Sequence, residues 1–373
     1  MFNVKDSTIL LTVSGSRAYG MNHAASDVDL QGVCVPPREY FHGFVNCFEQ
    51  ANSPSHIQPF FSNLNDEEQV AAGSTKLEGT VFGVLKFFAL ARDCNPNIIQ
   101  TLFAEDASVR VCTPLGARLR ESREMFLSKA ARFRFSGYAM SQLKRIQLHR
   151  GYLLSPKEEK PTRESFGLPT VPQIDPSQFG MVRAEVDRQM DCWNSGFVGE
   201  LDESMKIRLR ESIAGLLSEL KITEETKIQA ACNKLGFDTN FTAYFQTENR
   251  YNSAVKEWES YQRWKSERNS VRAAMEARFG YDGKHAAHLV RLMRMCVEIL
   301  RDGEVHVMRP DAKELLAIRS GAWTYDHLIE VAADLESQCA SLYKTSTLPH
   351  HPDIKAIDEL CIEIVERNLR GEK

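Results

Sequence analysis

The feature of this sequence that most constrains its fold is a short apolar run near the start, Ile9–Val13, which Gly15 and Ser16 follow at once. A run of this length that ends at a glycine is typical of a buried strand. A second segment, Val28–Val35, alternates apolar and polar residues and stops at two consecutive prolines, which end a strand. The two segments predict two strands with a tight turn after the first.

Gly15 and Ser16 are suited to phosphate binding, because the first strand is expected to lead into a short helix at this point. Glycine lets a phosphate approach the backbone closely, and the amide N–H groups at the start of a helix attract anions. The Ser16 hydroxyl can add one hydrogen bond. Arg17 could contact the same phosphates, or it could form an ion pair on the surface.

Asp27 and Asp29 stand at positions i and i+2 on the predicted second strand. Residues two apart on a strand point to the same face, so the two carboxylates are expected to lie side by side. Mg²⁺ prefers oxygen ligands, and a pair of such ions about 3.5–4 Å apart can activate an attacking oxygen and stabilise a leaving pyrophosphate. The pattern therefore predicts metal ligands. A solvated strand edge is the alternative for an isolated Asp-x-Asp.

Several longer motifs point to one family. The segments "GSRAYG", "SDVDLQGVCVPP", "LKFFALARDCNPN", "PTRESFGLP" and "GYDGKHAAHLVRLMRM" spread from residue 15 to beyond residue 290. They resemble the RNA-repair-pathway DNA polymerase beta family, a bacterial and phage branch of the polymerase-beta-type nucleotidyltransferase superfamily. The resemblance implies an α+β fold, in which a polymerase-beta-like core of mixed sheet and flanking helices precedes a larger, mostly α-helical domain.

The resemblance also implies a third carboxylate on a following strand. By its offset from "LKFF" and "NPN", Glu78 in "KLEGTV" stands at that position, where the family usually has an aspartate. Glu78 would complete the metal site and accept the proton of the acceptor hydroxyl. A surface glutamate is the alternative, and Asp66, Glu67 and Glu68 are weaker rivals in a segment that reads as a solvated turn.

A helix near residue 290 carries a possible clamp. Lys284, His288 and Arg291 stand at positions i, i+4 and i+7, hence on one helical face. Such a face could bind nucleotide phosphates or the backbone of an acceptor. A solvated face with no ligand is the alternative.

The remaining pattern predicts the organisation of the chain. We expect a nucleotidyltransferase domain over residues 1–125 and a helical domain over residues 126–373, with a proline-rich loop at about 155–180. Residues 50–75 are expected to be irregular, a third strand is expected over Lys76–Val81, and Asn95 is expected to cap a helix that begins at Pro96.

Composition limits the classes of function. The 373 residues carry a formal net charge of −4, so a surface that is basic throughout is not expected, although a local basic groove is possible. The nine scattered cysteines show no metal-binding spacing and suggest reduced thiols in a cytoplasmic protein. No apolar run approaches the length needed to span a bilayer, so no membrane role is expected. The oligomeric state cannot be read.

Together, these features predict a nucleotidyltransferase that depends on Mg²⁺ or Mn²⁺. The enzyme would move a nucleoside monophosphate from a nucleoside triphosphate (NTP), with ATP the first choice, to an acceptor hydroxyl and release pyrophosphate. Gly15 and Ser16 would hold the β- and γ-phosphates, and the resemblance favours an RNA end as acceptor. The alternatives are a protein or small-molecule acceptor, or a nucleotide- or RNA-binding module without turnover.

Overall fold

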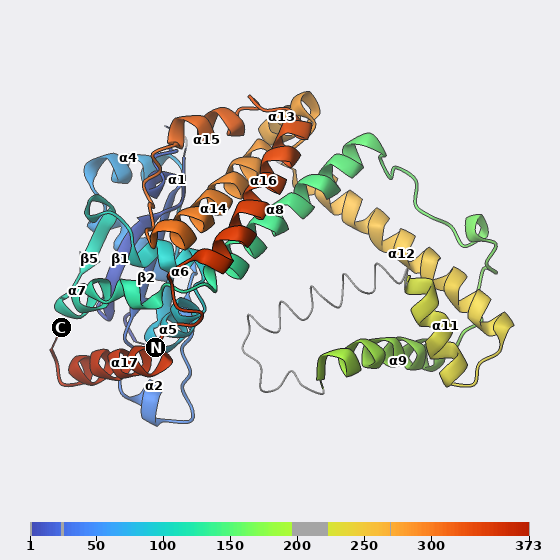
Figure 1. Cartoon of the computed structure of the whole chain (residues 1–373), viewed down its shortest axis with the longest axis horizontal. Coiled ribbons are helices and arrows are strands. Elements are labelled where there is room, and N and C mark those ends of the chain that lie inside the picture. Colours follow the sequence, from blue (N-terminus) through green and yellow to red (C-terminus); the bar gives the residue numbers. More distant parts are fainter. Residues whose placement is uncertain (1, 24–25, 196–222, 269, 373) are drawn as a thin grey trace. The chain divides into compact units, whose positions relative to one another are not determined.

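A computed structural model describes the chain apart from residues 1, 24–25, 196–222, 269 and 373. The described residues form two compact units (Figure 1). The first comprises Met1–Leu148 and Met275–Lys373, and the second comprises His149–Ala274. The domain boundary predicted near residue 125 stays a prediction.

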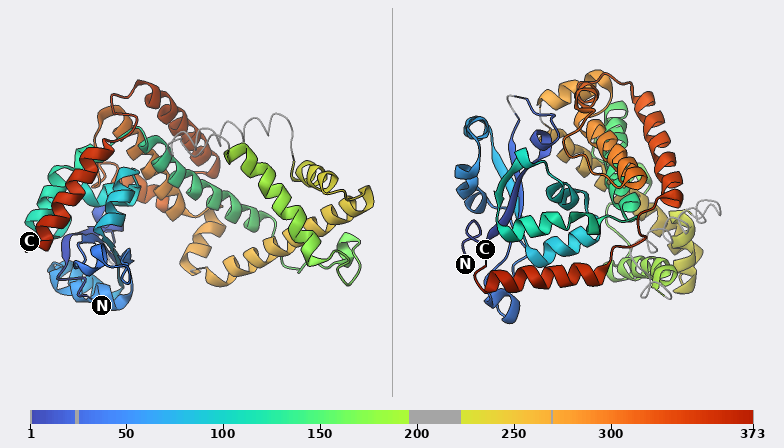
Figure 2. Two further views of the ribbon diagram at one scale, coloured as in Figure 1. Left: turned by 90° about the horizontal axis from the view of Figure 1, so that it is seen from below. Right: turned by 60° about the vertical axis from the view of Figure 1, so that its left-hand side comes forward.

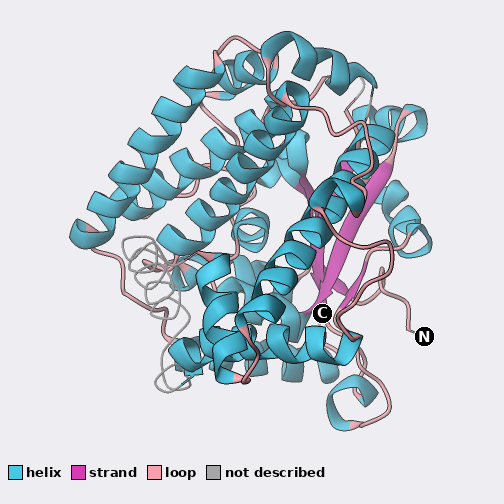
Figure 3. Cartoon of the chain, turned by 90° about the vertical axis from the view of Figure 1, so that its right-hand side faces the viewer, coloured by secondary structure: helices cyan, strands magenta, loops and turns pink. Residues whose placement is uncertain are grey.

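The first unit contains a five-stranded mixed sheet with the strand order β3-β4-β2-β1-β5. Strand β1 is antiparallel to β2 and β5, β3 is antiparallel to β4, and β2 runs parallel to β4. The predicted α+β architecture is confirmed, and Figure 3 shows the strands gathered in one part of a mostly helical chain. The strand bounds are Thr8–Ser14 (β1), Val28–Cys34 (β2), Gln50–Ala51 (β3), Leu77–Gly83 (β4) and Val109–Cys112 (β5).

Short helices cover one face of this sheet, in the segment that we expected to be irregular. That prediction was wrong: residues 50–75 contain α3 (Pro54–Ile57), the 3₁₀ helix η1 (Gln58–Asn63) and α4 (Asp66–Ser74). Phe60 and Leu64 pack there against apolar side chains of the strands. These helices are too short to show a helical repeat of apolar residues, so the sequence pattern missed them.

The other face of the sheet belongs to a larger core that joins both ends of the chain. Strand residues such as Ile9 and Val33 share this core with the long helix α14, which contacts α15 and α16. Helix α17 packs against α5 and α7, so the last helix of the chain lies beside the first quarter (Figure 2). The helix bounds are Val84–Arg92 (α5), Pro96–Leu102 (α6), Pro114–Glu121 (α7), Gly283–Asp302 (α14), Ala312–Arg319 (α15), Tyr325–Thr345 (α16) and Ile354–Leu369 (α17).

Local sequence signals explain several helix ends. The Asn95 side chain accepts a hydrogen bond from the backbone N–H of Asn97, as expected for the cap of α6. Gly303 ends α14 with φ of +72°, a conformation that glycine adopts without strain. The remaining elements of this unit are α1 (Gly15–Ala18), α2 (Glu39–His42), η2 (Asp106–Ser108) and η3 (Arg123–Phe126).

The second unit combines helices with a long proline-rich loop and has a small core of its own around Val182, Ile228 and Phe245. The proline-rich segment within this unit is anchored by Arg163, whose guanidinium donates to both carboxylate oxygens of the buried Glu248 at 2.6 and 2.7 Å. The helices are α9 (Pro176–Ser195), α11 (Glu224–Lys234), α12 (Thr239–Glu267) and η4 (Glu164–Phe166), while α8 (Ala131–Leu154) and α13 (Ser270–Phe279) cross between the units.

None of the helices that the structure describes combines the length and the apolar character that a bilayer crossing requires.

Candidate active site

The turn after β1 lies directly against a carboxylate of β2. Gly15 begins α1 with φ of +64°, in the left-handed region that favours glycine. A Cβ atom on this residue would overlap Oδ2 of Asp29. Glycine is therefore required at position 15 both by the backbone conformation and by the carboxylate that approaches it.

Strand register places Asp29 beside Glu78. In the parallel pair of β2 and β4, these two residues are Cα partners, and Asp29 is also the partner of Ser14 in β1. Asp27 is exposed and lies just before β2, which begins at Val28. The three acids chosen from the sequence thus stand at the same end of two neighbouring strands.

The electrostatics of Asp29 show that these charges interact. Burial raises the pKa of the Asp29 carboxyl above its ordinary value, and the negative charges of Asp27 and Glu78 raise it further. The ammonium of Lys284, which comes from the first turn of α14, acts in the opposite direction. Carboxylates that repel one another in this way favour a bound cation.

Glu78 has a cationic partner on its own strand segment. Its carboxylate forms an ion pair with Lys76, two residues earlier, and both side chains are largely exposed. The hydrogen bond and charge of Glu78 raise the pKa of Lys76, with a smaller contribution from Asp27. Among the residues that the structure describes, no three His, Cys, Asp or Glu side chains lie close enough to hold one metal ion.

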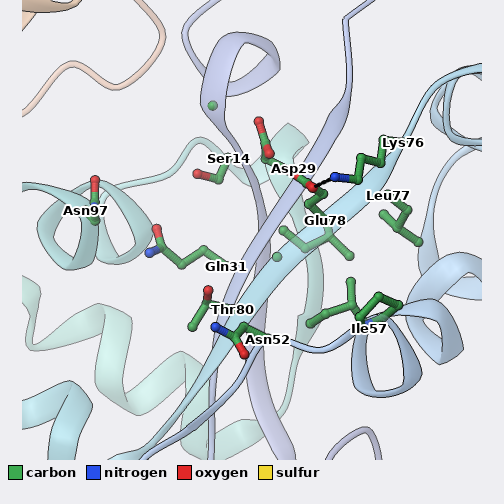
Figure 4. Close-up of a pocket in the computed structure, with 14 residues that line it drawn as sticks. Ser14, Asp29, Gln31, Asn52, Ile57, Lys76, Leu77, Glu78, Thr80 and Asn97 are labelled. Carbon is green, nitrogen blue, oxygen red and sulfur yellow. Dashed lines mark ion pairs between the residues drawn. The ribbon is translucent and has the colours of Figure 1, made fainter. Parts of the chain in front are cut away.

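A pocket of about 610 Å³ opens beside these carboxylates. Figure 4 shows Asp29, Glu78 and Lys76 together at one end, with Thr80 and Asn52 toward the other. The lining residues are Ser14, Gly15, Asp29, Leu30, Gln31, Asn52, Pro54, Ile57, Lys76, Leu77, Glu78, Gly79, Thr80 and Asn97. Ser16, next to Gly15, lies within α1.

Arg17 does not line this pocket. Its guanidinium donates to the Ser26 carbonyl oxygen at 3.3 Å and forms an ion pair with Glu67 at 3.4 Å. The side chain is 8% exposed, whereas that of Glu67 is 80% exposed. Arg17 therefore ties α1 to the segment just before Asp27.

The three residues of the predicted clamp do not share an exposed face. Lys284 is exposed and acts on Asp29, but Arg291 is 2% exposed, so our interpretation of one open face was wrong. The physical reason is that α14 lies inside the larger core, where neighbouring elements cover most of its surface. His288 accepts a hydrogen bond at Nδ1 from Arg291 at 3.1 Å.

Arg291 is buried and contacts residues next to the turn at Gly15. Its guanidinium stacks 3.7 Å from the centre of the Tyr19 ring, which directly follows α1. It also donates to Oε1 of Gln100 at 3.2 Å, and the Tyr19 hydroxyl donates to the same oxygen at 2.6 Å. Arg291 therefore connects α14 to the residue that directly follows α1.

Three residues of this region, Lys76, Tyr19 and Gln100, were not predicted from the sequence. Lys76 could have been recognised, because it stands two residues before Glu78 on a predicted strand and so shares its face. Tyr19 and Gln100 carried no such signal, since their partner Arg291 lies far away in the sequence.

The rival acids of α4 have other partners. Glu68 is buried, accepts from Nε of Arg110 at 2.7 Å and completes the cap of its helix. Glu67 pairs with Arg17, and Asp66 lies in the first turn of the same helix. These contacts give the acids structural roles in stabilising α4 and its neighbours.

A comparison with known protein families finds a match for the part of the chain that holds the carboxylates. Residues 3–160 match the model of the RNA repair pathway DNA polymerase beta family. The matched segment, which is less than half of the chain, is similar to that family. The match includes the whole sheet with Gly15, Asp29 and Glu78, and it ends before Lys284. Searches of the curated proteins and of the solved structures found no significant match.

Proposed function

We propose that this chain is a metal-dependent nucleotidyltransferase. It would transfer a nucleoside monophosphate from an NTP, ATP being the first to test, to an acceptor hydroxyl with release of pyrophosphate. The observation that carries the proposal is the contact of Gly15 with Asp29, because it joins a phosphate-binding turn to a carboxylate whose strand partner is Glu78. The family description supports an RNA end as the acceptor.

The donor set fits a hard cation. Asp27, Asp29 and Glu78 supply only carboxylate oxygens, the ligands that Mg²⁺ and Mn²⁺ take. Asp27 and Asp29 would hold the ion, and Glu78 would join them after release from Lys76. When bound, the ion would neutralise charge on the phosphates and on the leaving pyrophosphate. The raised pKa of Asp29 supports this assignment, because burial and then the charges of Asp27 and Glu78 raise it, and a nearby cation would offset both effects.

The chain's own groups would orient the reaction. The backbone of the turn at Gly15 and Ser16 would hold the β- and γ-phosphates, and Lys284 would add positive charge from α14. Glu78 would accept the proton of the acceptor hydroxyl as its oxygen attacks the α-phosphorus. The bond from that phosphorus to pyrophosphate then breaks, so catalysis rests on positioning and charge neutralisation.

The test uses the full chain with α-labelled NTPs, Mg²⁺ or Mn²⁺ and a pool of RNA, analysed on a denaturing gel. Label in RNA is the expected result, and Asp27→Asn should abolish it while leaving the fold intact. The matched control is Asp106→Asn, an exposed aspartate of η2. An active Asp27→Asn variant would overturn the mechanism.

The same gel distinguishes the other candidates. Label on the protein itself would point to a protein acceptor. NTP binding without transfer to any acceptor would point to a binding module without turnover and would refute the proposal.

A further inference from the structure

One side of the pocket in Figure 4 is polar but carries no formal charge. It consists of Gln31, Asn52, Thr80 and Asn97, and we call it the neutral side of the pocket. Gln31 and Thr80 are Cα partners in β2 and β4, two residues beyond Asp29 and Glu78 on the same face. Asn52 follows β3, and Asn97 lies in the first turn of α6.

The register shows that the neutral side extends away from the phosphate-binding turn. Asp29 pairs with Ser14, next to Gly15, whereas Gln31 pairs with Thr12, farther back along β1. Two residues of a strand span about 7 Å. The carboxylates therefore stand between the turn and the neutral side.

The chemistry of the neutral side selects the kind of group that it can bind. Three carboxamides and a hydroxyl offer both hydrogen-bond donors and acceptors. The side-chain Oε1 of Gln31 accepts a hydrogen bond from the Thr101 hydroxyl at 2.8 Å, and this contact does not use the donor groups of the side-chain amide. Ile57 and Leu77 add apolar surface to the same pocket.

A phosphate is a poor occupant of this side. The charged residues that line the pocket are Asp29, Glu78 and Lys76, and the lysine is already paired with Glu78. The net charge of this lining is negative and would repel a phosphate. A nucleoside suits it better, because carboxamides pair with base edges and apolar side chains pack against a base.

We infer that the neutral side of the pocket binds the terminal nucleoside of the acceptor, through its base edge and sugar hydroxyls. This inference rests on the proposed function. In a displacement at phosphorus, the attacking and leaving oxygens lie roughly in line. Because the pyrophosphate would leave toward the turn at Gly15, the acceptor hydroxyl must arrive from the opposite side of the carboxylates, where the neutral side lies.

A double variant, Thr80→Val with Asn97→Ala, tests this assignment. Both changes remove hydrogen-bonding groups from the neutral side and spare the carboxylates. The loss of two neutral hydrogen bonds should raise KM for the RNA acceptor about tenfold. KM for the NTP should stay unchanged. Asn240→Ala, an exposed asparagine of α12 in the other unit, is the matched control. A rise in KM for the NTP instead, or no change in either, would overturn the inference.

A binding measurement separates this inference from the proposed function. Saturation-transfer NMR would follow adenosine and uridine with the full chain, with a non-hydrolysable ATP analogue present in excess. We expect nucleoside binding that the analogue does not displace and that the double variant loses. Nucleoside binding by a chain that shows no transfer activity would support the nucleoside site and refute the proposed nucleotidyltransferase activity. Displacement by the analogue would show that the site holds the base of the NTP.

Discussion

Replacing Gly15 by alanine is expected to disable the candidate site without an unusual loss of stability. Gly15 has φ of +64°, and Gly303 at the end of α14, in the same unit, has φ of +72°. An alanine held in this left-handed region costs about 1–2 kcal/mol. Gly303→Ala is therefore a matched control, and both variants should lose about this much free energy of unfolding.

The two positions differ in the space around them. A Cβ on Gly303 would meet the Leu348 side chain at 3.9 Å, an ordinary contact. A Cβ on Gly15 would overlap Oδ2 of Asp29 and lie 3.3 Å from its Cβ, so the carboxylate must turn away. Disturbing the surroundings of a metal ligand typically lowers metal affinity by about 10- to 100-fold. We expect a loss of that size in Gly15→Ala alone.

Three measurements check this reasoning. Urea unfolding gives the stability of each variant, electron paramagnetic resonance gives Mn²⁺ affinity, and NTP turnover gives activity. The argument is refuted if Gly15→Ala binds Mn²⁺ as tightly as the wild type. It is refuted equally if Gly303→Ala loses Mn²⁺ affinity to the same extent, since the overlap with Asp29 would then be irrelevant.

Two further predictions concern charged groups. Lys76→Met should tighten Mn²⁺ binding by about two- to fivefold, because it releases Glu78 from an exposed ion pair, and such pairs are weak. If Lys86→Met tightens Mn²⁺ binding equally, the gain comes from the lost positive charge and not from the release of Glu78. Burial, followed by the charge of Arg291, lowers the pKa of His288 to about 3. The His288 imidazole takes up a proton near pH 6.5 in the unfolded chain but only near pH 3 in the folded chain. The free energy of unfolding should therefore fall by about 1.4 kcal/mol for each pH unit as the pH drops from 6.5 toward 3. Urea unfolding at several pH values should show that His288→Gln loses this dependence of stability on pH. The control His42→Gln, at an exposed histidine, should keep it.

The sequence predicts the site best where strand periodicity and turn chemistry act locally. The strand at Ile9–Val13, the glycine at position 15 and the spacing of the two aspartates each follow from neighbouring residues. The same reasoning wrongly predicted irregular structure over residues 50–75. The helices there are held by scattered contacts, such as the packing of Phe60 against the sheet. The capping box of Asn65 with Glu68 and the acidic first turn were local signals for α4.

Helical spacing alone could not separate the cation that acts on Asp29 from the cation that is buried. Lys284 and Arg291 stand on one helix, seven residues apart, yet only the first acts on Asp29. Arg291 is buried, and burial lowers the pKa of its guanidinium because a charge in this position is desolvated. Its stacking on Tyr19 and its hydrogen bond to Gln100 connect the C-terminal helices to the turn at residue 15.

This connection bears on the extent of the functional site. The family match ends at residue 160, but a lysine at residue 284 acts on the central carboxylate. The helix that carries this lysine is fixed to the turn through the buried Arg291. A fragment restricted to the matched residues would therefore lack both the added positive charge and the contact of Arg291 with Tyr19. The site that we propose requires α14 as well as the sheet.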